Sequence, residues 1–217
     1  SAINPLAIKN YQDGINIRKV KTDKADALKI ARFALDKWEI LPQYTPMDTI
    51  RYDLKTLHRQ FQLSSKTKTA LNNNLIALLE QSYPGSYKYF DSPVRPDGTQ
   101  KWVDYVDTFW HVDCVAKVSQ KAFAERYRKW CKRHGYNFSE KKAIELHTDA
   151  RQKFALVPKS DTCKLLVKEA VAQLNAVSRT VEAYRAEMDR LASQLPEYDT
   201  VMAMTGVSKS MGPQLMA

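Results

Sequence analysis

Two heptad repeats constrain the fold of this chain more than any other feature. Apolar residues alternate four and three positions apart between residues 48 and 83, with a polar interruption at Ser64 and Lys68, and again over four heptads between residues 160 and 195. This spacing places apolar side chains on one stripe of a helix, and such a stripe must be buried against a partner. The seam residues are Ile50, Leu54, Leu57, Phe61, Leu71, Leu75 and Leu78 in the first repeat and Val167, Ala170, Leu174, Val177, Val181, Tyr184, Met188, Leu191 and Leu195 in the second.

The two seams have two candidate partners. One is each other, as antiparallel coiled-coil arms with the intervening residues folded at the tip. The other is the same helix of a second copy, so the pattern also favours a homo-oligomer formed through the coiled coil. Pro84-Gly85 and Pro196 follow the two repeats and predict where the helices end.

Between the two repeats the residue composition changes and the heptad pattern stops. Residues 85–100 are rich in Pro, Gly, Ser and Tyr and predict a loop, whereas the pattern beyond Trp102 is helical and aromatic. Residues 117–142 hold nine Lys or Arg against two Glu, interleaved with aromatic rings. Such a segment can clamp phosphates and stack on bases, and we name Arg126, Lys129 and Arg133 as candidate nucleic-acid contacts. The alternative is that the rings face a small core and the charges face water.

A separate group of residues between the repeats has the spacing of a zinc site. The pairs His111-x-x-Cys114 and Cys131-x-x-His134 have zinc-ligand spacing. However, no Gly or Pro lies between Gln100 and His134, and a continuous helix would hold the two cysteines about 25 Å apart. The sequence therefore disfavours a structural zinc.

Composition narrows the class of protein. The 217 residues carry a formal net charge of +10 with 44% hydrophobic residues, which suits a folded chain of one or two domains and a polyanionic partner. Three cysteines without a Cys-x-x-Cys pair favour reduced thiols in a cytoplasm. No apolar stretch approaches the length needed to span a membrane.

Two carboxylates stand out near the start of the chain. Asp23 and Asp26 follow the Asp13-Gly14 turn and open a predicted helix that extends to about Lys37. Positions three apart share a helix face, so the pair can converge on a hard divalent cation. The alternative is that Asp23 caps the helix and Asp26 occupies its third position, without any metal.

Two stretches of sequence resemble the DEDD transposases of bacterial insertion sequences, relatives of the pilin-gene inversion recombinases. Ile3-Asn4-Pro5 with Lys19 to Ala27 is similar to the second half of their catalytic domain. Leu195 to Tyr198, with Met204 to Val207 and Gly212 to Ala217, resembles the opening of their C-terminal transposase domain, as the start of a helix-hairpin-helix-type element.

The resemblance implies a role for the acidic pair. Members hold Mg²⁺ with four carboxylates on a ribonuclease H-like domain, and Asp23 and Asp26 match the third and fourth, which makes them the expected catalytic and metal-binding residues. The first two carboxylates would lie before Ser1 and the nucleophilic serine after Ala217, so we expect an internal fragment that is inactive alone.

Further expectations follow from the same resemblance. Lys21 and Lys24 flank the acidic pair and are expected to contact backbone phosphate. The partners implied are DNA and a guide (bridge) RNA, in a bacterial cytoplasm near the nucleoid and without a membrane. The alternatives left open are a non-catalytic nucleic-acid-binding coiled-coil module and a coiled-coil assembly protein.

The predicted fold is mainly α and has five parts. The end of a ribonuclease H-like α/β domain is followed by a long-helix antiparallel coiled coil with a helical insertion, and then by the start of a helical transposase domain. The expected limits are 1–48 for the catalytic-domain end, 49–84 and 160–196 for the two arms, 85–159 for the basic aromatic insertion and 197–217 for the transposase domain.

Overall fold

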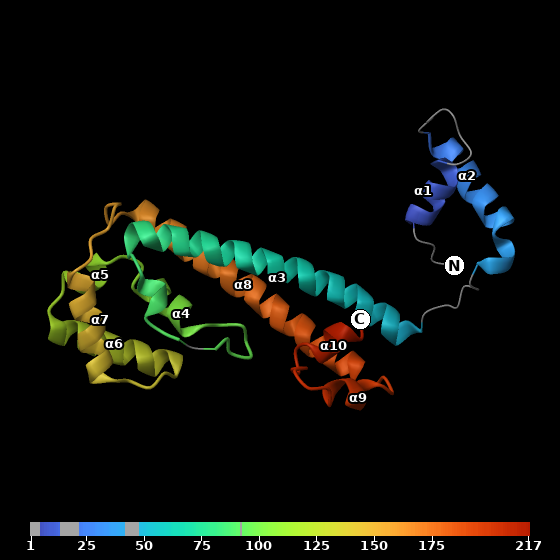
Figure 1. Ribbon diagram of the computed structural model, residues 1–217. Helices are drawn as coiled ribbons and strands as arrows, with labels where there is room; N and C mark the ends of the chain where they lie inside the picture. Colours follow the sequence, from blue (N-terminus) through green and yellow to red (C-terminus); the bar gives the residue numbers. More distant parts are fainter. Residues whose placement is uncertain (1–4, 14–21, 42–47, 92) are drawn as a thin grey trace. The chain divides into compact units, whose positions relative to one another are not determined.

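The computed structural model describes residues 5–13, 22–41, 48–91 and 93–217, and every regular element in these ranges is a helix (Figure 1). The prediction of a mainly α chain is therefore confirmed. The strand end expected near Ile3 lies outside the described residues. The chain divides into two compact units, residues 1–48 and 49–217.

The first unit contains α1 (Pro5–Asp13), α2 (Asp23–Asp36) and the short 3-10 helix η1 (Trp38–Ile40). Phe33 is the buried residue of α2, and its ring meets Tyr11 of α1 edge-on at 5.2 Å between centroids. The Tyr11 hydroxyl also donates a hydrogen bond to the Asp36 carboxylate. The helix predicted from Asp23 to about Lys37 is confirmed.

The second unit is built on two long helices, α3 (Thr49–Ser82) and α8 (Asp161–Ala192), which lie side by side in Figure 1. Their seams meet within one chain and run antiparallel. The start of α3 shares an apolar cluster with the end of α8, and the end of α3 shares another with the start of α8. The first cluster contains Leu54, Phe61, Val181, Met188 and Leu191, and the second contains Leu75, Leu79, Val167, Val171 and Leu174.

Residues seven apart form the buried line of each seam. In α8 these are Val167, Leu174, Val181, Met188 and Leu195 just beyond its end, all buried. In α3 these positions are Leu54, Phe61, Lys68, Leu75 and Ser82, all buried except the half-buried Lys68. The alternate seam residues Leu57, Leu71 and Leu78 are half-buried. Leu79, which the heptad reading omits, is fully buried because a straight helix drifts away from a strict seven-residue repeat.

The polar interruption of the first repeat lies between the two apolar clusters. Ser64 and Lys68 are half-buried there. Burial lowers the pKa of the Lys68 ammonium, and Glu182 of α8 partly opposes this shift. A polar layer of this kind can set the register of two packed helices, because any slip would leave its charges among apolar neighbours.

Residues between the long helices fold at one end of the α3/α8 pair (Figure 1). They comprise η2 (Ser86–Lys88), α4 (Lys101–Thr108), α5 (Asp113–Ala116), α6 (Gln120–His134) and α7 (Glu140–Arg151). The buried rings of Tyr83, Tyr105, Phe123, Tyr127 and Trp130 join this insertion to the α3/α8 seam in one core. Burial raises the pKa of Tyr83 to about 12, and its hydroxyl lies 3.2 Å from that of Tyr105.

The continuous helix expected between Gln100 and His134 is wrong. The chain leaves α4 after Thr108, buries Phe109 to Val112 in the core and begins α6 only at Gln120. Ser119 caps α6 by accepting a hydrogen bond from the Ala122 amide at 3.2 Å. Tertiary burial of the aromatic turn thus ends a helix that no Gly or Pro interrupts.

The second unit ends in two short helices, α9 (Tyr198–Met202) and α10 (Gly212–Leu215), and α10 packs against both α9 and α8. The Tyr198 hydroxyl donates to the Asp189 carboxylate of α8 at 2.8 Å, and Arg51 of α3 pairs with Glu197 at 2.6 Å. None of the described helices is both long and apolar enough to cross a bilayer.

The buried seam leads to a first prediction. Replacing Leu75, which is fully buried, with Ala should lower the free energy of unfolding by about 2–5 kcal/mol, because the cavity it leaves cannot close completely. Leu63→Ala, on the same helix but 60% exposed, should change it by less than about 0.5 kcal/mol. Urea denaturation followed by circular dichroism measures both, and equal losses would contradict the seam.

A glycine contact between the insertion and α8 yields a second prediction. Gly98 has a φ of +82°, and a Cβ there would lie 2.6 Å from the Ser178 backbone carbon of α8. Gly135 has a similar φ of +68° but open space around it. Gly98→Ala should therefore cost about 1–3 kcal/mol more than Gly135→Ala in the same unfolding measurement. Equal costs would show that only the backbone conformation matters at Gly98.

Candidate nucleic-acid interface and acidic pair

The acidic pair lies in the first turns of α2. Thr22 caps this helix, because its hydroxyl accepts a hydrogen bond from the Ala25 amide at 3.2 Å. Asp23 is then the first helical residue, and the interpretation in which Asp23 itself caps the helix is wrong. The Asp26 amide makes the first intrahelical bond, to the Thr22 carbonyl at 3.0 Å.

Both carboxylates are exposed and lie one turn apart. The Asp26 carboxylate pairs with the Lys29 ammonium at 3.2 Å. Lys24 is exposed on the same turn, whereas Lys21 lies outside the described residues. In the described ranges no three His, Cys, Asp or Glu side chains cluster as metal ligands. Asp23 and Asp26 by themselves supply two carboxylate donors, which are the type of ligand that Mg²⁺ prefers.

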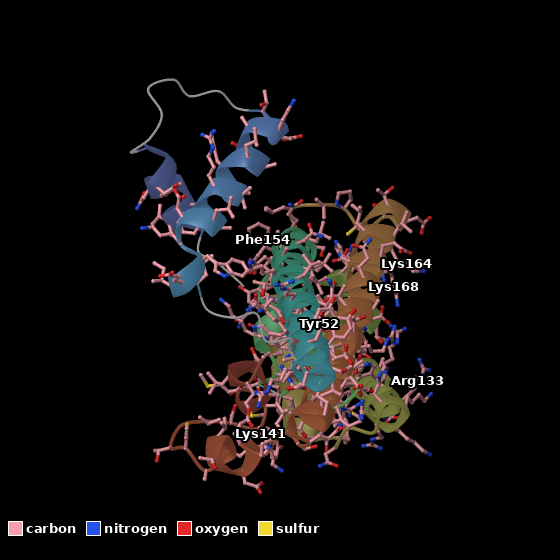
Figure 2. The ribbon with its side chains drawn as sticks, turned by 90° about the vertical axis from the view of Figure 1, so that its right-hand side faces the viewer. Tyr52, Arg133, Lys141, Phe154, Lys164 and Lys168 are labelled. Carbon is pink, nitrogen blue, oxygen red and sulfur yellow. The ribbon has the colours of Figure 1, made fainter. Side chains whose placement is uncertain are left out.

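The cations predicted to contact nucleic acid share one face of α6. Arg126, Lys129 and Arg133 follow one another at intervals of three and four residues and are exposed. The Arg133 side chain projects outward from α6 in Figure 2.

The adjoining face of α6 carries the aromatic residues of this segment. Phe123, Tyr127 and Trp130 are buried in the core, so none of these rings projects into solvent between the cations. For residues 117–142, the aromatic side chains therefore fit the interpretation in which the rings pack into the core. The charged side chains remain a candidate surface for nucleic acid.

The three cations of α6 also line a pocket of about 320 Å³ together with a fourth, Lys159, from the loop between α7 and α8. Thr108, Phe109, Cys114 and Trp130 complete the lining. Positive charge therefore surrounds a largely apolar floor, and the lining contains no carboxylate.

Four other cations of the second unit's insertion have an acidic neighbour. Lys117 pairs with Asp113 at 2.7 Å, Arg128 with Glu125 at 3.5 Å, Lys142 with Glu145 at 2.7 Å and Lys153 with Asp149 at 2.5 Å. By contrast, Arg126, Lys129, Arg133 and Lys159 form no ion pair with any described residue. Unpaired cations around one concavity attract a polyanion strongly, because the concavity focuses their field.

The loop that carries Lys159 is held in place by backbone hydrogen bonds. The amides of Leu156 and Val157 both donate to the Gln81 carbonyl of α3, at 2.8 and 3.3 Å. The Val157 carbonyl in turn lies 3.1 Å from Nε2 of His111. These contacts place the Lys159 backbone beside the pocket before any ligand arrives.

The residues with zinc-ligand spacing have other partners. Nδ1 of His111 accepts a hydrogen bond from the Asp113 amide at 3.1 Å, which, with the Val157 contact, engages both ring nitrogens. His134 lies 3.6 Å from the Asp104 carboxylate. The described ranges contain no group of three His, Cys, Asp or Glu side chains placed to hold a metal ion.

Sequence reasoning identified three of the pocket's cations and missed the fourth. Lys159 belongs to no motif, and only the antiparallel return of the chain brings it to α6. Phe109 was likewise not predicted to share a site with α6, and Cys114 was grouped with α6 residues only in the disfavoured zinc site.

Comparison with known proteins adds one match. Residues 1–84 match the model of the DEDD_Tnp_IS110 family, described as a transposase, and this segment contains the acidic pair and α3. The transposase family predicted from the sequence is confirmed over these residues. No curated protein and no solved structure matches the chain.

Proposed function

We propose that this chain, whose residues 1–84 match a transposase family, is part of an enzyme that cuts and rejoins DNA during transposition. The observation that carries the proposal is that the family match spans Asp23 and Asp26. Support comes from the unpaired cations of α6, which provide a separate surface for a polyanion.

In this proposal Asp23 and Asp26 hold Mg²⁺ as two members of a larger carboxylate set in the full-length enzyme. Bound Mg²⁺ would neutralise and polarise the DNA phosphate that reacts. The two carboxylates lie one turn apart on α2, and positions with this spacing share a helix face, which supports a common metal ion. Lys24, exposed on the same turn, balances their charge or contacts a neighbouring phosphate.

The helical body of residues 49–217 holds nucleic acid in this proposal, and its partners are DNA and a guide RNA. A net charge of +10 and the exposed cations Arg126, Lys129 and Arg133 support a phosphate-rich partner. Pairing of copies through faces of α3 and α8 outside their shared seam, and action in the bacterial cytoplasm at the nucleoid, belong to the same proposal.

A second candidate is a non-catalytic nucleic-acid-binding module. One observation favours it: Asp26 already pairs with Lys29, and acidic residues stabilise the first turn of a helix without any metal. In this case the family resemblance would describe ancestry and the acidic pair would stabilise α2.

A third prediction separates these candidates. In the full-length protein, Asp23→Asn should reduce Mg²⁺-dependent DNA strand exchange by about 10²-fold or more, because a metal-binding carboxylate is removed. Binding of DNA or RNA, measured by fluorescence anisotropy, should change less than about twofold, since binding depends on the cationic surface. Glu39→Gln, an exposed charge removal in the same unit, is the control and should leave both unchanged. Retained strand exchange in the Asp23 variant would favour the non-catalytic candidate.

A fourth prediction concerns the α6 surface. Replacing Arg126, Lys129 and Arg133 together with Gln should weaken binding to a single strand and lower the slope of log affinity against log salt by about 2, since each phosphate that is no longer neutralised accounts for about 0.7. The measurement is an anisotropy titration at several salt concentrations.

The control for this prediction removes equal charge from other faces of the same helix. Gln at Lys121, Arg128 and Lys132 changes the net charge by the same amount but leaves the pocket lining intact. Identical slopes for the two triple variants would assign binding to net charge alone.

A further inference from the structure

The basic pocket has two properties that simple attraction to a phosphate backbone does not require. Its floor is apolar, formed by Phe109, Cys114 and Trp130, and its volume is about 320 Å³. A backbone of phosphates needs cations on an open surface, because each phosphate carries its charge outward into water. An apolar concavity instead suits a planar or aliphatic group, and pockets of about 300 Å³ and above are typical of small-molecule sites.

We propose that this pocket takes one unpaired nucleotide of a single-stranded segment. The phosphates on either side of the nucleotide contact Arg126, Lys129, Arg133 and Lys159, and the base enters the concavity. Guanidinium planes can stack on bases, so Arg126 and Arg133 contribute to both interactions. The inference rests on the proposed nucleic-acid-binding function and names the part of the ligand that this site recognises.

The pocket is held rigidly enough for such recognition. The buried rings of α6 anchor the helix that carries three of the cations, and the hydrogen bonds to Gln81 and His111 anchor the loop that carries the fourth. A preformed site loses less entropy on binding than one that must be ordered by its ligand.

A paired duplex fits this site poorly. Its bases are stacked and paired inside the helix, so only its phosphates could reach the rim, and the apolar floor would stay unused. An unpaired nucleotide in a loop, bulge or single strand can be turned outward and can use both the floor and the rim. RNA and DNA both supply this chemistry, and they differ at the 2′-hydroxyl.

Filling the floor without changing charge tests the inference. Cys114→Phe places a ring in the concavity and keeps all four cations. In the full chain it should weaken binding of a short single-stranded oligonucleotide about tenfold, the loss typical of one unstacked base, while binding of a blunt duplex changes less than about twofold. Cys163→Phe, the same substitution at a half-buried cysteine outside the pocket lining, is the control and should change neither.

A second measurement needs no variant and so does not depend on how Phe packs. Cys114 and Cys163 are both half-buried free thiols, and only Cys114 lines the pocket. Saturating single-stranded oligonucleotide should slow alkylation of Cys114 several-fold relative to Cys163 in the same sample, read by mass spectrometry, while saturating duplex should not. Matched RNA and DNA oligonucleotides in parallel arms identify which strand the pocket prefers.

Three outcomes decide the matter. Loss of single-strand binding in Cys114→Phe, with protection of the Cys114 thiol, supports the inference. Undiminished binding by Cys114→Phe, with unprotected Cys114 at saturation, overturns it and leaves the proposed transposase function standing. Failure of the unaltered chain to bind any oligonucleotide overturns both this inference and the nucleic-acid-binding part of the proposed function, independently of the strand-exchange result for Asp23→Asn.

Discussion

The antiparallel contact between α3 and α8 is the interaction on which the rest of the second unit depends. Its buried line of residues seven apart supplies apolar area that neither helix could bury alone. Because the two helices run in opposite directions, the chain leaves α3 and re-enters α8 at the same end. The insertion can therefore fold as an extension of the seam, in one core with it.

This connectivity also creates the basic pocket. Residues 153–160 must pass the end of α3 to reach α8, and the hydrogen bonds of Leu156 and Val157 to Gln81 fasten them there. Lys159 reaches the cationic face of α6 by this route. If the seams of α3 and α8 were buried only against a second copy, the chain would not return along α3, and residues 153–160 would not be brought to α6.

Charge is distributed unevenly over the insertion. Lysines and arginines such as Lys117, Arg128 and Lys142 are neutralised by acids three or four residues away, so they add little field at a distance. The four pocket cations have no such partners among the described residues, and their field adds up over one concavity. Net charge alone would not have separated these two groups.

The sequence alone determined the helical character of the chain, the two long helices and the start of α2, because heptad spacing, caps and prolines act over a few neighbouring residues. The residues around Asp23 and Asp26 also pointed to the transposase family whose model matches residues 1–84. The break between α4 and α6, the burial of Leu79 and the recruitment of Lys159 and Cys114 were decided only by the tertiary structure. Each depends on which distant segment covers a residue, and burial of Phe109 or Trp130 in a shared core stabilises the fold more than the local helix preference that the sequence displays.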